Sequence, residues 1–352
     1  MQNQSKTPKQ QAEKPVQIQK AAQAAADVDN FKSANARVTK HSPVALINQD
    51  NIHVLEKLHP PSLRRGCVKT GTSTRSGGTK RKFKATPSQV VHTLSHLNRG
   101  KATGINCDSL DLYINAARRL NPKDSKDLSR AKALAGFFNR VINGEVPTQF
   151  QTFIRQTYLV ALEKDPDDKN KLRPLGVPSA IRRIAGILVL HEYASTFAEY
   201  LLPFNYTIGV GGGVDVVIKT VQLAIDQYII EPEKNGDLPS CSLVSLDIRN
   251  MFNAVSRERL REIISEKFPT LEAYADLIYD GAGETFVRLE DGQWHILPVM
   301  EGFSQGCPAS PVFAALVLHD ILSQIQPQLD NRAAQRKAAG DLGDDQVSAL
   351  DM

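Results

Sequence analysis

The spacing of apolar residues predicts a chain that is helical at first and gains strands in its second half. Apolar positions three or four apart, bounded by capping residues and prolines, predict helices. These helices are expected over about 87–98, 108–120, 127–143, 179–201, 214–230, 257–268 and 311–325. Short apolar runs predict extended segments at 157–163 and 172–178, and Asp291-Gly292 between 285–289 and 293–299 is a strong hairpin signal.

Residues 241–248 alternate in the way expected of a half-buried strand. Leu243, Ser245 and Asp247 fall on one face of it, and Val244, Leu246 and Ile248 fall on the other. Ser256 then caps the next helix, which Pro269 ends. The pattern therefore predicts a strand that carries a carboxylate, Asp247, at its end.

The rest of the chain divides by composition. Residues 1–40 are rich in Gln, Lys and Ala, so we expect them to be disordered. Residues 41–85 are expected to form a short helix and a basic Gly/Ser linker. The apolar periodicity covers 86–325, which predicts the globular part, and 326–352 is a polar tail without a core pattern.

The formal charge of +5 is modest, but the basic residues are concentrated. Residues 62–87 contain Lys and Arg with no acidic residue; the candidate phosphate contacts are Arg64, Arg65, Lys80, Arg81, Lys82 and Lys84. Such a run favours a polyanion, since each phosphate contact releases counterions. A solvated basic linker is the alternative, and the same cluster resembles a nuclear address.

The four cysteines lie far apart, which argues against a zinc module or a disulfide framework and favours an intracellular, nuclear or cytoplasmic, location. No apolar run approaches the roughly 18 residues of a membrane span, so no membrane association is expected.

Asp247 is the first candidate for chemistry. Two-metal phosphoryl transfer needs carboxylates held rigidly so that two divalent ions lie about 3.5–4 Å apart. Phe252 follows five residues later, where its ring could lie under the sugar of an incoming nucleotide and disfavour a 2′-hydroxyl. A turn or capping role for Asp247, and a core position for Phe252, are the alternatives.

Two further segments carry candidate ligand contacts. Gln305 and Gly306 stand between the predicted hairpin and a helix, where the backbone can approach a ligand closely; a simple tight turn is the alternative. Lys164 and Arg173 flank a polar turn between two predicted strands, and paired cations suit a triphosphate. Ordinary surface charge remains the other interpretation.

In this order, the segments resemble reverse transcriptases of the non-LTR retrotransposon and group II intron type. The resemblance covers about 86–325. It rests on Gly100-Lys101-Ala102-Thr103-Gly104, on Arg173-Pro174-Leu175-Gly176-Val177-Pro178, on Leu246-Asp247-Ile248-Arg249-Asn250-Met251-Phe252-Asn253, and on Gly302-Phe303-Ser304-Gln305-Gly306-Cys307-Pro308-Ala309-Ser310-Pro311.

The resemblance implies an α+β right-hand polymerase fold, with fingers and a partial palm built on an antiparallel sheet. It implies RNA-templated DNA synthesis from dNTPs on an RNA template with a DNA primer, dependent on Mg²⁺ or Mn²⁺. By that likeness Asp247 ligates metal and Phe252 selects the sugar. Lys164 and Arg173 would hold the triphosphate, and Gln305 with Gly306 would position the nucleotide or template.

The sequence departs from the family at one point. A Tyr/Phe-x-Asp-Asp hairpin, which supplies the further metal-binding carboxylates in these enzymes, has no clear counterpart in residues 1–352. Asp344 and Asp345 lie at a tolerable distance, but no apolar strand or aromatic residue precedes them. The sequence thus predicts a reverse transcriptase domain for RNA-templated DNA synthesis, truncated before this motif, and leaves open whether residues 1–352 are active alone. A non-catalytic nucleic-acid-binding remnant and an RNA-dependent RNA polymerase are the alternatives.

Overall fold

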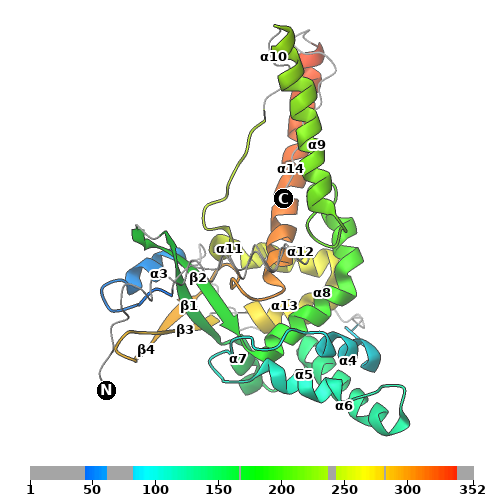
Figure 1. Cartoon of the computed structure of the whole chain (residues 1–352), viewed down its shortest axis with the longest axis vertical. Helices are drawn as coiled ribbons and strands as arrows, with labels where there is room; N and C mark the ends of the chain where they lie inside the picture. The colour runs from blue at the N-terminus through cyan, green and yellow to red at the C-terminus, as the bar shows by residue number, and fades with distance from the viewer. Residues whose placement is uncertain (1–43, 62–81, 166–167, 237–242, 281–282, 339–352) are drawn as a thin grey trace, which may run out of the picture. The chain divides into compact units, whose positions relative to one another are not determined.

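The computed structural model describes residues 44–61, 82–165, 168–236, 243–280 and 283–338 of the 352-residue chain. These residues form α-helices and one four-stranded sheet (Figure 1), which confirms a fold that mixes α and β structure. By its contacts the chain divides into a smaller unit, residues 1–45 with 161–173, and a larger unit, residues 46–160 with 174–352.

Helices account for most of the larger unit between residues 87 and 201. They are α4 (Pro87–Ser95), α5 (Leu110–Arg118), α6 (Ser125–Ile142), α7 (Thr148–Arg155) and α8 (Ala180–Leu201). The start of α4 is as predicted. The Thr86 side chain accepts from the Gln89 N–H, and the Gln89 side chain accepts from the Thr86 N–H, which is a capping box.

Residues 83–85, assigned from the sequence to the end of the linker, pack on this bundle. Asn139 on α6 and Asn143, which caps the C-terminal end of that helix, each form hydrogen bonds with both backbone groups of one residue in that segment. The Ala85 N–H donates to Asn139 Oδ1 at 2.8 Å, and Asn139 Nδ2 donates back to the Ala85 carbonyl at 3.0 Å. Asn143 does the same for Phe83. The two asparagine side chains thereby provide hydrogen-bond partners for the backbone of a segment that has no regular secondary structure.

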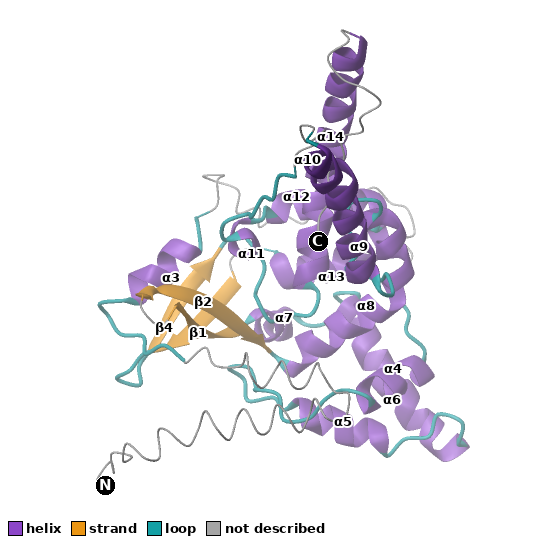
Figure 2. Ribbon diagram, turned by 45° about the horizontal axis from the view of Figure 1, so that its top comes forward, coloured by secondary structure: helices purple, strands orange, loops and turns teal. Residues whose placement is uncertain are grey.

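The sheet, shown in orange in Figure 2, has the strand order β2-β1-β3-β4. The strands are β1 (Thr157–Asp165), β2 (Asp168–Pro178), β3 (Gly283–Arg288) and β4 (Trp294–Val299). The predicted hairpin around Asp291-Gly292 is confirmed, since β3 and β4 pair antiparallel and Gly292 has a positive φ of 87°.

The expectation of an antiparallel sheet is wrong. Strand β1 pairs in parallel with β3, with Thr157 opposite Thr285. A parallel neighbour requires a long crossover connection, and the helices between β1 and β3 provide it. The sheet is therefore mixed.

A short helix, α3 (Ile52–Leu58), lies within the 41–85 segment, as predicted. Ile52 and Leu55 are its buried residues. Around it, the Glu290 N–H donates to the Ile47 carbonyl at 2.7 Å, and His295 Nε2 lies 3.4 Å from Glu56 Oε1. These contacts attach Ile47 and helix α3 to the β3–β4 hairpin.

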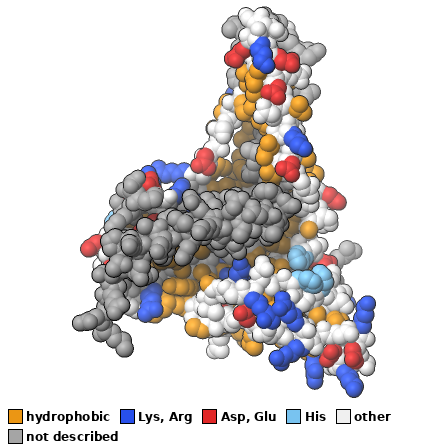
Figure 3. All heavy atoms as spheres, viewed as in Figure 1, with side chains coloured by type: hydrophobic (Ala, Val, Ile, Leu, Met, Phe, Trp, Pro, Cys, Tyr) orange, Lys and Arg blue, Asp and Glu red, His pale blue; other side chains and the backbone are white. Residues whose placement is uncertain are grey.

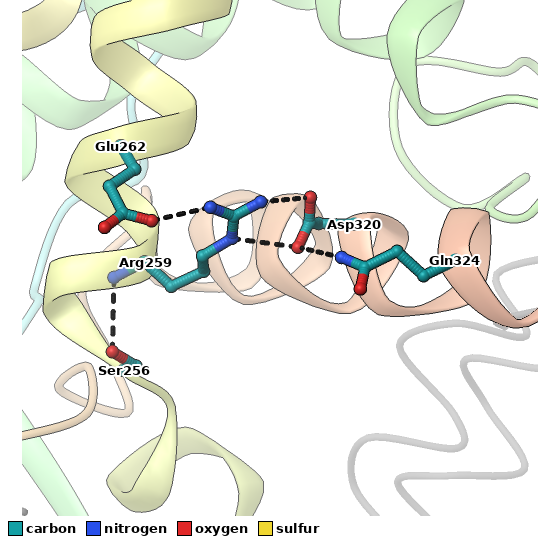
Figure 4. Close-up of polar contacts among 5 residues, drawn as sticks. All are labelled: Ser256, Arg259, Glu262, Asp320 and Gln324. Atoms are coloured by element: carbon teal, nitrogen blue, oxygen red, sulfur yellow. Dashed lines mark hydrogen bonds and ion pairs between the residues drawn. The ribbon is translucent and has the colours of Figure 1, made fainter.

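The C-terminal helices of the larger unit are α12 (Arg257–Lys267), α13 (Glu272–Tyr279) and α14 (Ser310–Ala338). Helix α14 runs past the predicted end near 325, through Pro327, and so takes in the first part of the predicted polar tail. Side-chain amides support the extension: Gln324 Nε2 donates to Asp320 Oδ2 and Gln326 Nε2 to Asp330 Oδ1, each four residues away. Arg259 on α12 also binds Asp320 through two nitrogens (Figure 4).

Helix α9 (Gly213–Ile225) continues through a π-helical turn (Asp226–Ile230) into α10 (Glu231–Asn235), which confirms the helix predicted over 214–230. The strand predicted over 241–248 is wrong for the residues that the structure describes. Residues 243–248 have no regular secondary structure, and the four-residue α11 (Met251–Ala254) follows them.

One contiguous hydrophobic core joins α4–α8, α12, α13 and the start of α14; its largest fully buried side chains include Tyr274, Phe138, Phe197, Phe303 and Phe313. Within the described ranges, no helix is both long and apolar enough to cross a membrane. The predicted disordered segment 1–40 lies outside the described residues, as do Arg64, Arg65, Lys80, Arg81, Asp344 and Asp345.

Candidate functional site

Two of the segments singled out from the sequence meet directly. The Gly176 N–H on β2 donates to the Gln305 carbonyl at 2.6 Å. A Cβ added at Gly176 would lie 1.9 Å from Ser304 Oγ, and one added at Gly306 would lie 2.3 Å from the Gly176 carbonyl oxygen. Gly306 also has a φ of 115°, which side chains rarely tolerate. Glycine is therefore required on both sides of this junction.

The end of the Asp-x4-Phe segment joins the same turn. The Phe303 N–H donates to the Phe252 carbonyl at 2.5 Å, and the Gly302 N–H donates to the Val255 carbonyl at 2.9 Å. Gly302 has a φ of 72°, and a Cβ there would lie 2.3 Å from the Asn253 backbone. Phe252 is half-buried and packs against the core.

A polar pocket opens beside this junction, with Gly176, Ser304 and Gln305 in its lining. Three arginines, Arg155, Arg182 and Arg257, are also in its wall, with Glu301 as the carboxylate there. The wall thus carries more positive than negative charge, which favours anions in general.

The arginines of this wall are held mainly by backbone carbonyls. Arg182, only 3% exposed, donates through Nη1 to the Arg155 carbonyl at 3.1 Å and to Thr157 Oγ1 at 3.3 Å. Its Nε is buried without a hydrogen-bond partner. Arg257 donates through Nε to the Gly302 carbonyl at 2.8 Å, which ties it to the glycine turn.

The Tyr279 ring faces two of these guanidinium groups, at 5.6 Å from Arg182 and 5.2 Å from Arg257. Such cation–π contacts stabilise buried cations. Burial lowers the pKa of Arg257 to about 10, so it stays charged at neutral pH. Burial also raises the pKa of the Tyr279 hydroxyl, which lies 3.3 Å from Ser310 Oγ.

His59 completes the wall on the side of α3. Its Nδ1 lies 2.8 Å from the Leu55 carbonyl, which can only accept, so Nδ1 carries the proton. Burial lowers the pKa of His59, and the charge of Arg257 adds to this effect. The imidazole is therefore neutral at pH 7.

Asp247 lies apart from regular structure, within an exposed segment, and no hydrogen bond or ion pair joins it to another described residue. Among the residues that the structure describes, no three His, Cys, Asp or Glu side chains come together as a metal site would require. Within the described residues, Asp247 therefore stands without the further carboxylates that a two-metal centre would need.

Lys164 on β1 and Arg173 on β2 both belong to the smaller unit, and both side chains are exposed. Beside them Lys171 Nζ lies 2.9 Å from Asp165 Oδ2, and this hydrogen bond raises the pKa of the lysine. The hairpin is therefore a charged surface of its own unit.

Of the basic residues proposed to contact phosphates, two are described. Lys82 forms an ion pair with Glu145, with Nζ 2.5 Å from Oε1, and Lys84 is exposed. Pairing with Glu145 places Lys82 among the contacts that hold residues 83–85 on the helical bundle.

Sequence reasoning missed two features. One is the set of buried arginines; the signal for Arg182 was a charged residue inside the otherwise apolar start of α8. The other is a basic surface over α4–α6, where Figure 3 shows Lys and Arg side chains gathered with histidines beside them. The exposed Lys and Arg residues of these helices and their connections include Arg99, Lys101, Arg118, Arg119 and Lys132.

No protein-family model matches this chain, and no curated protein matches it.

Proposed function

We propose that this chain forms the fingers and part of the palm of a nucleic-acid polymerase of the reverse transcriptase type, which performs RNA-templated DNA synthesis. The observation that carries the proposal is the junction between Gly176 and Gln305. Two segments that resemble separate polymerase motifs, far apart in the sequence, pack so closely that neither tolerates a side chain on its glycine.

The proposed roles follow the resemblance. Asp247 would ligate Mg²⁺ or Mn²⁺, and Phe252 would lie near the sugar of the incoming dNTP. Gln305 and Gly306 would position nucleotide or template, and Lys164 with Arg173 would hold the triphosphate. RNA template and DNA primer would be the nucleic-acid partners. The exposed basic surface over α4–α6 supports binding of a polyanion.

A second function of a different class is nucleic-acid binding without turnover. Asp247 is exposed and has no hydrogen-bond or ion-pair partner among the described residues, which favours this function, because a metal-ligating carboxylate works only when other groups hold it in place. RNA synthesis is a weaker alternative, since a bulky ring at Phe252 is expected to disfavour ribonucleotides.

Primer extension separates these functions. The purified chain would be incubated with a primed RNA template, Mg²⁺ and dNTPs, alongside Asp247→Asn and the control Asp215→Asn, which changes an exposed carboxylate on α9. Extension by the native chain and the Asp215 variant, but not by the Asp247 variant, would establish polymerase activity. Absence of extension with retained RNA binding would establish the binding function.

Nucleotide selection tests the Phe252 role separately. If the native chain extends primers, Phe252→Val is expected to raise rNTP incorporation relative to dNTP incorporation, because the smaller side chain leaves room for a 2′-hydroxyl. An unchanged ratio would remove Phe252 from sugar selection and leave it as a core residue.

A salt series tests the binding surface. Replacing Arg118 and Arg119 with Gln should weaken RNA binding and lower the slope of log K against log salt by about one for each lost phosphate contact. Replacing Arg64 and Arg65 with Gln tests in the same way whether the basic linker contributes phosphate contacts to RNA binding. An unchanged slope in either variant would remove that group from the interface.

A further inference from the structure

Residues 243–248 combine two properties that rarely occur together in a folded chain. Their apolar side chains are exposed: Leu246 by 87%, Val244 by 73%, Leu243 by 61% and Ile248 by 49%. In addition, no hydrogen bond joins the backbone of these residues to any other described residue. The same short segment thus exposes apolar side chains and has backbone amides without a partner among the described residues.

The side-chain pattern is that of a β-strand without a neighbour. Val244, Leu246 and Ile248 would share one face of such a strand, and Ser245 and Asp247 would share the other. Folded proteins usually protect such an edge with a proline, a bulge or inward-pointing charges. Between Leu243 and Ile248 the sequence has none of these except Asp247, so the segment is suited to pair with another strand.

The C-terminal end of the segment is fixed to the larger unit. Asn250, with a φ of 57°, precedes α11 and donates through Nδ2 to the Leu58 carbonyl at 2.7 Å. Asn253 Nδ2 in turn donates to Asn250 Oδ1 at 2.8 Å. The strand-like residues therefore project from a defined anchor, and a partner strand would meet a positioned edge.

We propose that this segment pairs with the same segment of a second copy of the chain, antiparallel and with the two-fold axis at Leu246. In that register Leu246 faces Leu246, and Val244 faces Ile248. On the other face the Ser245 hydroxyl lies opposite the Asp247 carboxylate, which can accept its proton in a hydrogen bond. Leu243 lies opposite Arg249, whose stem can cover it. In this register no two like charges lie opposite one another, and each apolar side chain faces an apolar group.

Neighbouring registers are less favourable. Moving the two-fold axis to Asp247 brings the two carboxylates face to face, and moving it to Ser245 sets Leu243 against Asp247. A parallel, in-register pair would align Asp247 with Asp247 and Arg249 with Arg249. Like charges directly opposite one another destabilise strand pairs, so the Leu246 register is selected by charge as well as by packing.

The association is expected to be weak. A six-residue strand pair buries far less than the roughly 1,200 Å² of a stable interface. We therefore expect a dimer whose population rises through the micromolar to millimolar concentration range. The contact is isologous, so it closes at two copies and does not propagate into fibres. This proposal does not depend on polymerase activity.

Sedimentation equilibrium of the full chain over a hundredfold range of concentration tests the proposal. The native chain should show a monomer–dimer equilibrium, and Leu246→Lys should weaken it at least tenfold, because two ammonium groups would meet at the axis. Leu223→Lys is the matched control, since Leu223 is a 67% exposed apolar residue on α9. Circular dichroism confirms that each variant is folded.

Cysteine cross-linking tests the register. In a chain with Cys67, Cys107 and Cys241 replaced by Ser, Leu246→Cys should form a disulfide-linked dimer under mild oxidation. Val244→Cys, which would face Ile248, should do so far more slowly. A monomer at every concentration, a dimer weakened by Leu223→Lys and not by Leu246→Lys, or equal cross-linking at 244 and 246 would each overturn the proposal.

Discussion

The amide of Gly176 donates to the carbonyl of Gln305 at 2.6 Å, and Ser304 Oγ occupies the space where a side chain of residue 176 would begin. The Arg-Pro-Leu-Gly strand and the Gly-Phe-Ser-Gln-Gly turn are thus locked together without room for adjustment. Any ligand that contacts one of these segments lies close to the other.

Gly176→Ala should therefore destabilise the fold by about 1–3 kcal/mol, the usual cost of overpacking a closely packed site. The new Cβ would lie 1.9 Å from Ser304 Oγ and 2.9 Å from Thr157 Cγ2. The free energy of unfolding, measured by urea denaturation, checks this. Gly136→Ala is the control, since a Cβ at Gly136 in α6 meets nothing within 4 Å and should be neutral or stabilising by up to about 1 kcal/mol.

Adding Ser304→Ala to Gly176→Ala should restore part of the lost stability, because it removes the nearest clashing atom and leaves Thr157 in place. Equal stability of the single and double variants would show that the cost arises elsewhere than at this contact.

Local signals predicted the elements that local chemistry determines. Thr86-Pro87 begins α4 and Asp291-Gly292 forms the hairpin, because a cap or a tight turn depends on a few adjacent residues. Helix α7 was missed although Phe150, Phe153 and Ile154 have helical spacing, because an eight-residue segment gives that spacing little length in which to repeat. The extension of α14 was missed because the residues after 325 are polar and have no core pattern.

The site was predictable in its parts and not in its assembly. Gly176 and Gln305 were both singled out, but their contact depends on the tertiary fold. Alternation over 243–248 predicted a strand that the structure does not contain, because a strand needs a neighbour and no described segment pairs with these residues. Burial of Arg182 could not be inferred, since its partners are a backbone carbonyl, a threonine hydroxyl and an aromatic ring from elsewhere in the chain.

The side chain of Asn139 should be needed to hold Ala85, just before α4, against the helical bundle. Asn139→Leu removes both hydrogen bonds to Ala85 and leaves a buried N–H and carbonyl unpaired, at about 1–3 kcal/mol each. Hydrogen exchange at the Ala85 amide should accelerate and the free energy of unfolding should fall. Asn115→Leu, at an exposed position that bonds only Arg99, should change stability by less than about 0.5 kcal/mol. Unaltered protection at Ala85 would contradict the proposed pairing.

The ion pair between Arg259 and Asp320 should contribute measurably to the contact between α12 and α14. Nη2 lies 2.6 Å from Oδ1 and Nε 2.9 Å from Oδ2, a two-pronged geometry that resists side-chain rotation (Figure 4). Because the arginine is 42% exposed, solvent limits the gain. A double-mutant cycle with Arg259→Gln and Asp320→Asn should give a coupling energy of about 0.5–1 kcal/mol that falls with added salt.

The matched pair for this cycle is Arg130 and Asp127, three residues apart on α6, with a single contact of 3.4 Å. Its coupling energy should be smaller than that of the two-pronged pair. Equal coupling in both cycles would show that the second hydrogen bond adds nothing.

His59 should make the stability of the fold depend on pH below neutrality. Burial lowers its pKa in the folded chain from the ordinary value of 6.5, so the folded state binds fewer protons than the unfolded state. The free energy of unfolding should therefore fall as the pH drops through 6.5 and level off below the folded pKa, by at most about 1.4 kcal/mol per pH unit. His59→Gln, which keeps a donor for the Leu55 carbonyl but does not titrate, should flatten the profile between pH 7.5 and 5.5 in thermal unfolding. His53→Gln, exposed on the same helix, should leave the slope of the native chain unchanged. If the His59 variant retained that slope, the acid sensitivity would belong to another group and the neutral, buried state assigned to His59 would be wrong.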